Sequence, residues 1–275
     1  MTAIELLNEG KEALCKVTDE YELDAWYLFE HATGITRHEY LLDSMIAVSD
    51  EKCNAFRKYI SRRSEHIPLQ HIVGTQWFMG LEFNVNEHVL IPRQDTEVLV
   101  EETLKLLNGG ERVLDMCTGS GCIIISLAKN VKLAEAVAVD ISKDALGVAK
   151  DNARKHDADV EFVESDLFVE LEDSKYDVIV SNPPYIETDE ISRLMPEVCE
   201  HEPVLALDGG VDGLVFYRRI IREAHRYLKD GGSLLLEVGH NQADEVCRLM
   251  AEAGFKDVSG VKDLCGIRRV CKGRL

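Results

Sequence analysis

The tetrapeptide Asn182-Pro183-Pro184-Tyr185 holds the most specific chemistry in this sequence. It directly follows an apolar run at residues 176–180 that is typical of a buried strand. The Asn182 side-chain oxygen and the Pro183 carbonyl can each accept a hydrogen from a flat NH2 group, and Tyr185 offers a ring to stack on it. Because Pro184 restricts its predecessor to an extended conformation, the Pro183 carbonyl has a fixed direction. The pattern predicts a receptor for an NH2 group; a plain proline turn is the alternative.

A second candidate site is the turn at residues 115–122, which reads Asp-Met-Cys-Thr-Gly-Ser-Gly-Cys. Small residues between a strand and a helix let backbone amides approach a ligand closely. The dinucleotide fingerprint G-x-G-x-x-G fails here, because Ile124 stands at the third glycine when the motif is read from Gly119. Asp115 could instead meet a positively charged amino acid moiety, directly or through water.

Acidic residues follow the next two expected strands. Asp140 is placed to hold ribose hydroxyls, Asp166 to mark an adenine edge, and Phe168 to cover the adenine face. Each carboxylate alone is more simply a helix cap or a turn residue. Together they lie at consecutive strand ends, where open α/β sheets bind their ligands, and Asn182 ends the fourth strand beside them. The combination predicts S-adenosylmethionine and methyl transfer to nitrogen.

Strand–helix alternation after residue 95 supplies the scaffold that these residues need. It predicts a mainly parallel sheet with helices on both faces, hence an α/β fold. We expect strands near residues 112–115, 136–140, 160–163, 176–180, 233–238, 257–261 and 267–272. We expect helices up to residue 128, from a Ser142 cap to about 155, over 214–228 and over 242–253.

The first third has helical periodicity, punctuated by Gly10 and Gly34, with Ser49-Asp50 as a helix start. Glycines, aromatic and β-branched residues from Ile72 to Ile91 then predict a β-hairpin. The expected domains are a helical domain at 1–72 that recognises the substrate, a hairpin linker at 73–92 and a catalytic domain at 93–275.

Composition narrows the class of protein. The chain has 275 residues, 45% of them hydrophobic, and a formal charge of −19, which disfavours nonspecific nucleic-acid binding. Arg57, Lys58, Arg62 and Arg63 could still form a local basic patch, or simply the solvated face of a helix. Eight scattered cysteines without a C-x-x-C pair favour reduced thiols over zinc or disulfides, so we expect no metal site. We expect a cytoplasmic protein without membrane segments.

Several segments resemble the release factor glutamine N5-methyltransferases, the HemK/PrmC family, over nearly the whole chain. The tetrapeptide alone is shared with adenine-N6 and other amino methyltransferases, whereas Leu-Ile-Pro-Arg-x-Asp-Thr-Glu is more particular to this family. The matching segments are residues 68–74, 90–97, the glycine turn, 182–186, 202–203, 206–214 and 236–239. The resemblance implies a class I S-adenosylmethionine-dependent methyltransferase fold with a seven-stranded sheet, a small N-terminal helical domain and a hairpin linker.

The resemblance also implies substrate, cofactor and residues. The substrate is the glutamine of the Gly-Gly-Gln loop in class 1 peptide chain release factors, and its contacts fall on Asn182, Pro183, Pro184 and Tyr185. The implied S-adenosylmethionine contacts are Cys117, Thr118, Gly119, Ser120, Gly121, Asp140, Phe168 and Asn182.

One position departs from the family pattern. Cys117 stands where the family usually has glycine, so a positive φ there would cost about 1 kcal/mol or more. A reactive thiol and a tolerated small residue are the two interpretations. Arg93 and Glu97 are expected near the mouth of the site, or else as a surface ion pair.

Two other functions stay open from the residues. An adenine-N6 methyltransferase acting on DNA or RNA would use the same NH2 receptor on a flipped base. A noncatalytic module could keep the fold after losing cofactor affinity, with Cys117 as the cause. The oligomeric state does not follow from the sequence, although a monomer is the simplest expectation.

Overall fold

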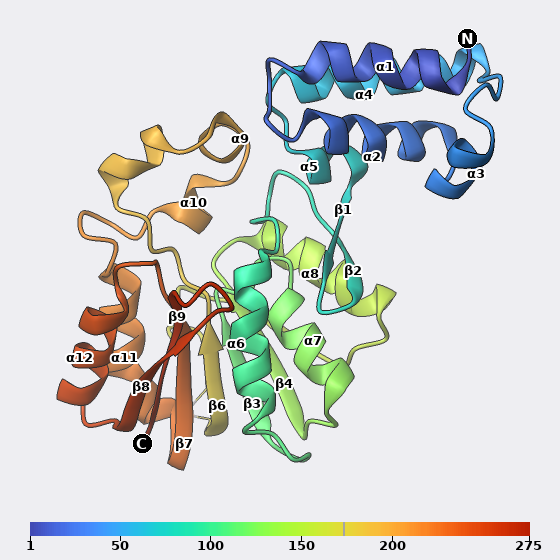
Figure 1. The fold of residues 1–275 in the computed structure, drawn as a ribbon. Helices are drawn as coiled ribbons and strands as arrows, with labels where there is room; N and C mark the ends of the chain where they lie inside the picture. Colours follow the sequence, from blue (N-terminus) through green and yellow to red (C-terminus); the bar gives the residue numbers. More distant parts are fainter. Residues whose placement is uncertain (173) are drawn as a thin grey trace. The chain divides into compact units, whose positions relative to one another are not determined.

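The computed structural model describes residues 1–172 and 174–275, which form two compact units (Figure 1). The first unit comprises Met1–Gly74 together with Met195–His201, and the second comprises Thr75–Leu194 and Glu202–Leu275. The hairpin therefore groups with the second unit. The short segment 195–201 groups with the first unit although it is distant in sequence.

Helices make up the first unit. Thr2 and Thr36 cap two of them as capping boxes with Glu5 and Glu39, and Ser49 caps α4, as its sequence predicts. Gly34 ends α2 in the left-handed conformation, with φ of 69°. The helices are α1 (Ala3–Leu14), α2 (Tyr21–Thr33), α3 (Arg37–Leu42), α4 (Asp50–Ser64), α5 (Leu69–Val73) and the one-turn α9 (Pro196–Cys199).

Gly10 lies inside α1 and does not interrupt it, so the expectation of a break there is wrong. The residue is buried where α1 packs on α4. A Cβ at Gly10 would lie 2.4 Å from Cζ of Phe56, far inside van der Waals contact. The glycine therefore serves close helix packing, which outweighs its low helix propensity.

Two of the four basic residues of α4 have acidic partners in the same unit. Arg63 is buried, and its Nε donates to Asp24 Oδ2 at 2.7 Å while Nη2 pairs with Glu197. The exposed Arg57 pairs with Glu9 at 2.6 Å. The charges of these two cations are therefore already neutralised by acidic residues of the protein. The ion pair between Arg63 and Glu197 also joins segment 195–201 to the helices.

The second unit begins with the predicted hairpin. Strands β1 (Thr75–Phe78) and β2 (Leu81–Asn84) pair antiparallel, with Phe78 opposite Leu81. Met79 and Gly80 form a two-residue turn, and both have positive φ, 49° and 73°, as tight hairpins require.

A seven-stranded mixed sheet forms the centre of this unit, in the order β5-β4-β3-β6-β7-β9-β8. The first five strands in that order are parallel to their neighbours, and β9 and β8 are antiparallel additions. The predicted α/β class is confirmed. The strands are β3 (Arg112–Met116), β4 (Glu135–Asp140), β5 (Glu161–Glu164), β6 (Tyr176–Ser181), β7 (Leu228–Glu237), β8 (Lys256–Lys262) and β9 (Arg268–Arg274).

Helices cover both faces of this sheet, as Figure 1 shows. Successive strand residues alternate between two cores: Leu114 packs with residues of α11 and α12, whereas Val113 packs with residues of α6 and α7. This alternation explains why the strands are apolar throughout. The helices are α6 (Gln94–Leu104), α7 (Cys122–Asn130), α8 (Lys143–Lys155, capped by Ser142), the short α10 (Val204–Leu207), α11 (Val215–Tyr227) and α12 (Ala243–Glu252), with a 3-10 turn, η1, at Thr188–Arg193.

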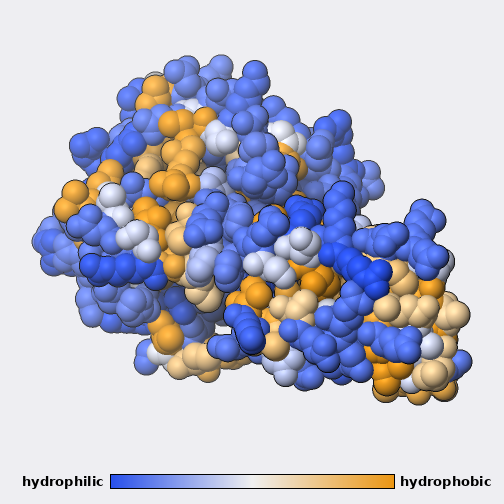
Figure 2. Space-filling view, turned by 90° about the horizontal axis from the view of Figure 1, so that it is seen from above, coloured by the Kyte–Doolittle hydropathy of each residue, from blue (hydrophilic) through white to orange (hydrophobic). Residues whose placement is uncertain are grey.

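Hydrophilic residues dominate the face in Figure 2, in keeping with the charge of −19. Hydrophobic side chains such as Leu41, Leu42 and Val211 are exposed in scattered places. Among the described residues, none of the helices has the length and apolar character needed to cross a membrane.

The buried Arg63–Asp24 pair generates a stability prediction. Asp24→Ala leaves the Arg63 guanidinium buried without its main partner, so we expect the helical unit to lose about 3–5 kcal/mol of unfolding free energy. Arg57→Ala, which breaks an exposed pair in the same unit, should cost less than about 1 kcal/mol. Denaturant unfolding followed by circular dichroism compares the two, and equal losses would contradict this assignment.

Candidate active site

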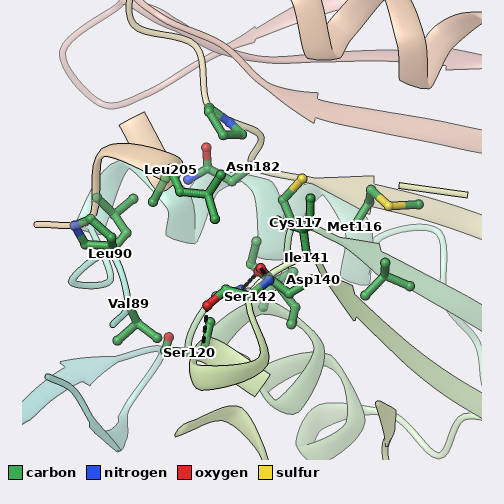
Figure 3. A pocket seen from close by; sticks show the side chains of 18 of the residues that line it. Val89, Leu90, Met116, Cys117, Ser120, Asp140, Ile141, Ser142, Asn182 and Leu205 are labelled. Carbon is green, nitrogen blue, oxygen red and sulfur yellow. Dashed lines mark hydrogen bonds between the residues drawn. The ribbon is translucent and has the colours of Figure 1, made fainter. Parts of the chain in front are cut away.

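The carboxyl ends of the central strands form the floor of a cavity of about 250 Å3 (Figure 3). Strand pairing aligns Met116 with Val139 and Ser181, and Ser181 with Leu236. The residues that follow these four therefore form one row at the edge of the sheet. Three members of that row, Cys117, Asp140 and Asn182, line the cavity, and the fourth is the buried Glu237.

The glycine turn after β3 contributes four of its expected residues to the cavity. Cys117, Thr118, Gly119 and Ser120 line it. Gly121 does not: it caps α7 with φ of 79°, and a Cβ there would lie 2.9 Å from Cδ1 of Ile125. This glycine permits close packing of the helix and does not face the cavity.

Cys117 occupies a left-handed backbone position, with φ of 61°. A side chain in this conformation costs about 1 kcal/mol relative to glycine, as the departure from the family pattern suggested. Burial raises the pKa of the Cys117 thiol, and the neighbouring Asp140 carboxylate raises it further. The thiol therefore stays protonated near neutral pH, which favours a tolerated small residue over a reactive nucleophile.

Asp140 lies at the centre of the cavity wall. Its Oδ2 accepts from the Gly119 backbone N–H at 2.8 Å, and its Oδ1 accepts from that of Ser142 at 2.9 Å. Burial raises the pKa of Asp140 against the lowering effect of these bonds. A carboxylate has about four acceptor sites, so the bonds orient Asp140 and still leave lone pairs for ligand hydroxyls.

Asp115 lies outside the cavity lining, so its contact with a charged amino acid moiety, directly or through water, stays a prediction. It is fully buried, and its Oδ2 accepts from the Thr118 hydroxyl at 2.6 Å. Burial raises the pKa of Asp115 to about 7. In the structure, the hydrogen bond from Thr118 to the Asp115 carboxylate stabilises the glycine turn.

The turn after β5 differs from the expectation for Phe168. Its ring is 1% exposed, stacks on Tyr227 with centroids 4.6 Å apart, and does not line the cavity. Leu167, which has φ of 55°, lines it instead. Asp166 also lines the cavity and pairs with Arg219 at 2.8 Å. The left-handed backbone at Leu167 places this side chain, and not that of Phe168, in the cavity lining, which residue types alone do not reveal.

Asn182 presents its amide in a defined orientation. Its Nδ2 donates to Thr96 Oγ1 at 3.3 Å, which leaves Oδ1 as the outward acceptor. In the part of the chain that the structure describes, no donor is bonded to this oxygen or to the Pro183 carbonyl. Pro184 lines the cavity, whereas the buried Pro183 and the half-buried Tyr185 lie outside its lining.

Two other segments hold the tetrapeptide loop. Gln242 Nε2 donates to the Tyr185 carbonyl at 2.8 Å and to the Gly213 carbonyl at 3.3 Å, while Gln242 Oε1 accepts from the Gly239 N–H at 3.0 Å. The segment 206–214 packs directly on the loop backbone, since a Cβ at Gly209 would lie 2.7 Å from Cα of Tyr185. The loop is therefore fixed by backbone contacts that only glycine permits.

Arg93 and Glu97 have different surroundings. Arg93 lines the cavity and pairs with Glu202 at 2.5 Å. Glu97 lies outside the lining, and its Oε1 accepts from the Met79 N–H at 2.7 Å, which stabilises the hairpin turn. The two residues do not pair with each other in this structure.

Sequence reasoning assigned no role to Thr96, Glu237 or Gln242. Thr96 and Glu237 lie within segments that carry the family resemblance, but the resemblance gave them no chemical role. Gln242 lies three residues beyond the last such segment, and its importance becomes visible only through the hydrogen bonds of its side chain.

The residues present suit S-adenosylmethionine. Asp140 offers acceptors for ribose hydroxyls, and apolar side chains such as Ile141 and Leu167 offer surfaces for a base. The cavity side of Gly119 is open, because a Cβ there would meet no atom within 4 Å. Hydrogen-bond acceptors beside apolar surfaces of this kind match a nucleoside ligand.

The close packing at Gly209 generates a prediction about the loop. Gly209→Ala places a methyl group against Tyr185 and Gly213 backbone atoms, so the loop must shift and turnover should fall at least about tenfold. Gly147→Ala is the control: it lies in α8 with no atom within 4 Å of the added Cβ. Equal activity of both variants in a methyl-transfer assay would show that the contact does not position the loop.

Family models match both parts of the chain. A model described as "PrmC N-terminal domain" matches residues 5–74, and one described as "Methyltransferase small domain" matches residues 94–209. In the solved structures, a methyltransferase from Pyrococcus furiosus superposes with a TM-score of 0.55 at 18% identity, covering 78% of this chain and 98% of that one. This likeness confirms the fold.

Curated relatives extend the match to nearly full length. The release factor glutamine methyltransferase of Geobacter sulfurreducens is 44% identical over 260 residues, which cover 94% of this chain and 92% of that protein. Its counterpart in Clostridium botulinum is 38% identical over 277 residues, 98% of each chain. With this identity over both units, the chain belongs to the release factor glutamine methyltransferase family.

Proposed function

We propose that this S-adenosylmethionine-dependent protein glutamine methyltransferase acts on the side-chain N5 of the glutamine in the Gly-Gly-Gln loop of class 1 peptide chain release factors. The observation that carries the proposal is the pair of available acceptors, Asn182 Oδ1 and the Pro183 carbonyl, at the end of β6. Two acceptors of fixed direction match the two hydrogens of a primary carboxamide.

The acceptor pair addresses the main difficulty of the reaction. An amide nitrogen is a weak nucleophile because its lone pair is delocalised into the carbonyl. Hydrogen bonds from both N–H groups to Asn182 and Pro183 would shift electron density toward nitrogen and hold the amide at one angle. Tyr185, two residues beyond Pro183, would pack against the flat amide. Preorganised acceptors of this kind cost no reorganisation during the reaction.

The cofactor would be held by Cys117, Thr118, Gly119, Ser120 and Asp140, with Asn182 beside it. When bound, S-adenosylmethionine supplies an electrophilic methyl group on a positively charged sulfur. The chain's own residues then contribute positioning, because two aligned reactants behave as in an intramolecular reaction. The same acceptors would stabilise positive charge developing on nitrogen, and the surplus proton would leave to solvent.

We also infer that the helical unit recognises the release factor, and that the enzyme works in the cytoplasm as a monomer. The match of residues 5–74 to a family-specific N-terminal model supports the first inference. The neutralisation of Arg57 and Arg63 by acidic partners supports a protein substrate over a nucleic acid.

Mass spectrometry of a release factor tests the proposal directly. After incubation with enzyme and S-adenosylmethionine, the peptide that contains Gly-Gly-Gln should gain one methyl group on glutamine. Transfer of labelled methyl to an adenine-containing oligonucleotide, with none to the release factor, would overturn the proposal in favour of an adenine-N6 activity.

Asn182→Ala should lower turnover by about two to three orders of magnitude, because it removes one preorganised acceptor. Its affinity for S-adenosylmethionine, measured by calorimetry, should fall much less. Asn108→Ala, an exposed asparagine outside the cavity lining, serves as the control. Near-normal turnover in Asn182→Ala would refute the assigned role.

Asp140→Ala should mainly weaken cofactor binding, by about tenfold or more, since hydrogen bonds to a charged group are among the stronger ones. Calorimetric titration with S-adenosylmethionine measures this change. Asp144→Ala, an exposed carboxylate in the first turn of α8, should bind the cofactor as the wild type does. Unchanged affinity in Asp140→Ala would remove Asp140 from the ribose site.

A further inference from the structure

One side of the cavity is built from two segments that are distant in sequence, residues 90–93 and 202–206. The lining residues that they contribute are Leu90, Pro92, Arg93, Pro203, Leu205 and Ala206. Figure 3 shows Leu90 and Leu205 across the cavity from Asp140. Neither segment belongs to the sheet, so strand register does not hold this side of the cavity in place.

The backbone of segment 90–93 takes a hydrogen-bond partner from the other segment. Ile91 is 2% exposed, so its N–H group needs an acceptor inside the protein. Pro92 has no N–H group of its own, and its carbonyl accepts from Gln76 Nε2 at 3.2 Å. The Ile91 N–H donates to Oε1 of Glu202 at 3.0 Å. The acceptor for this buried amide is therefore a side chain of segment 202–206.

The same carboxylate also binds Arg93. Nη2 of Arg93 pairs with Glu202 Oε2 at 2.5 Å, and the side chain of Glu202 is only 1% exposed, whereas that of Arg93 is 42% exposed. Burial of a carboxylate is costly unless an ion pair and hydrogen bonds compensate for the lost water. One oxygen of Glu202 bonds the backbone of segment 90–93 and the other bonds its side chain, so a single buried group joins the two segments.

We propose that Glu202 is a positioning residue for the cofactor: its carboxylate clamps segment 90–93 to segment 202–206 and so keeps one side of the cavity closed around bound S-adenosylmethionine. Glu202 lies outside the cavity lining and acts through Arg93 and the neighbouring residues that form it. This role rests on the proposed assignment of the cavity to the cofactor.

The clamp acts on retention of the cofactor more than on the reacting atoms. Asp140 is oriented by two backbone N–H groups, and the Asn182 amide bonds Thr96. None of these bonds involves Glu202. Loss of the clamp should therefore speed dissociation of the cofactor more than it slows methyl transfer in the bound complex.

Two substitutions separate the two contacts of the clamp. Glu202→Gln keeps an oxygen for the Ile91 N–H but removes the charge that pairs with Arg93, whereas Glu202→Ala removes both contacts. In hydrogen–deuterium exchange of the full-length protein without cofactor, the Ile91 amide should stay protected in Glu202→Gln and exchange at least about tenfold faster in Glu202→Ala. Amides within β3, which pairs with β4 and β6, should keep their protection in both variants.

Cofactor binding is the second measurement. Glu202→Gln should bind S-adenosylmethionine about three- to tenfold more weakly in calorimetry, mainly through faster dissociation. The KM for the cofactor should rise accordingly, while kcat at saturating cofactor changes less than about twofold. Glu102→Gln is the matched control, because Glu102 is also buried and paired, with Lys105 and with Lys272, but lies outside the cavity lining. It should bind the cofactor as the wild type does.

A double substitution shows whether the charge of Glu202 acts through Arg93. In an Arg93→Met background, adding Glu202→Gln should weaken binding no further, because the ion pair is already broken. Additive losses in the double variant, unchanged affinity in Glu202→Gln, an equal loss in Glu102→Gln or unchanged exchange of Ile91 in Glu202→Ala would each overturn the clamp. Because the exchange measurement contains no cofactor, a wild-type protein that shows the clamp there but fails to bind S-adenosylmethionine would instead overturn the proposed cofactor site.

Discussion

The hydrogen bond between the Asn182 amide nitrogen and Thr96 determines what the rest of this site can do. Amide oxygen and amide nitrogen occupy almost the same volume, so steric packing cannot choose between them. Because Thr96 accepts from the amide nitrogen, the amide oxygen is left to accept on the other side. The strand register and the packing of segment 206–214 hold the tetrapeptide loop, and with it the Asn182 amide, in place.

The register of the parallel strands determines which side chains lie together at the edge of the sheet. Because β3, β4, β6 and β7 end together, the turn with Cys117, the carboxylate Asp140, the amide Asn182 and the carboxyl Glu237 meet in one row. Three of these face the cavity and the fourth lies behind it. A single edge of the sheet therefore carries three residues that line the cavity and one buried carboxyl group behind them.

Local sequence signals predicted the seven strands of the sheet and much of this row. Ser49 and Ser142 cap helices where expected, a hairpin forms within residues 72–91, Asp140 ends its strand and Asn182 follows its strand. Cys117 takes the left-handed conformation considered from the sequence for this position, where the family usually has glycine. These predictions succeeded because each depends on a few neighbouring residues. Gly10 and Phe168 failed because Phe56 and Tyr227, both distant in sequence, decide their surroundings.

The sequence by itself determined the alternation of strands and helices, the identity of the NH2-receptor tetrapeptide and the acidic residues at strand ends, since periodicity and turn chemistry are properties of short segments. Tertiary structure decided which of those side chains share the cavity, and which glycines allow backbones to touch. It also decided that Thr96 and Glu237 stand behind Asn182. The hydrogen bond between Thr96 of α6 and Asn182 after β6 forms only when the packing of α6 on the sheet brings these two distant residues together.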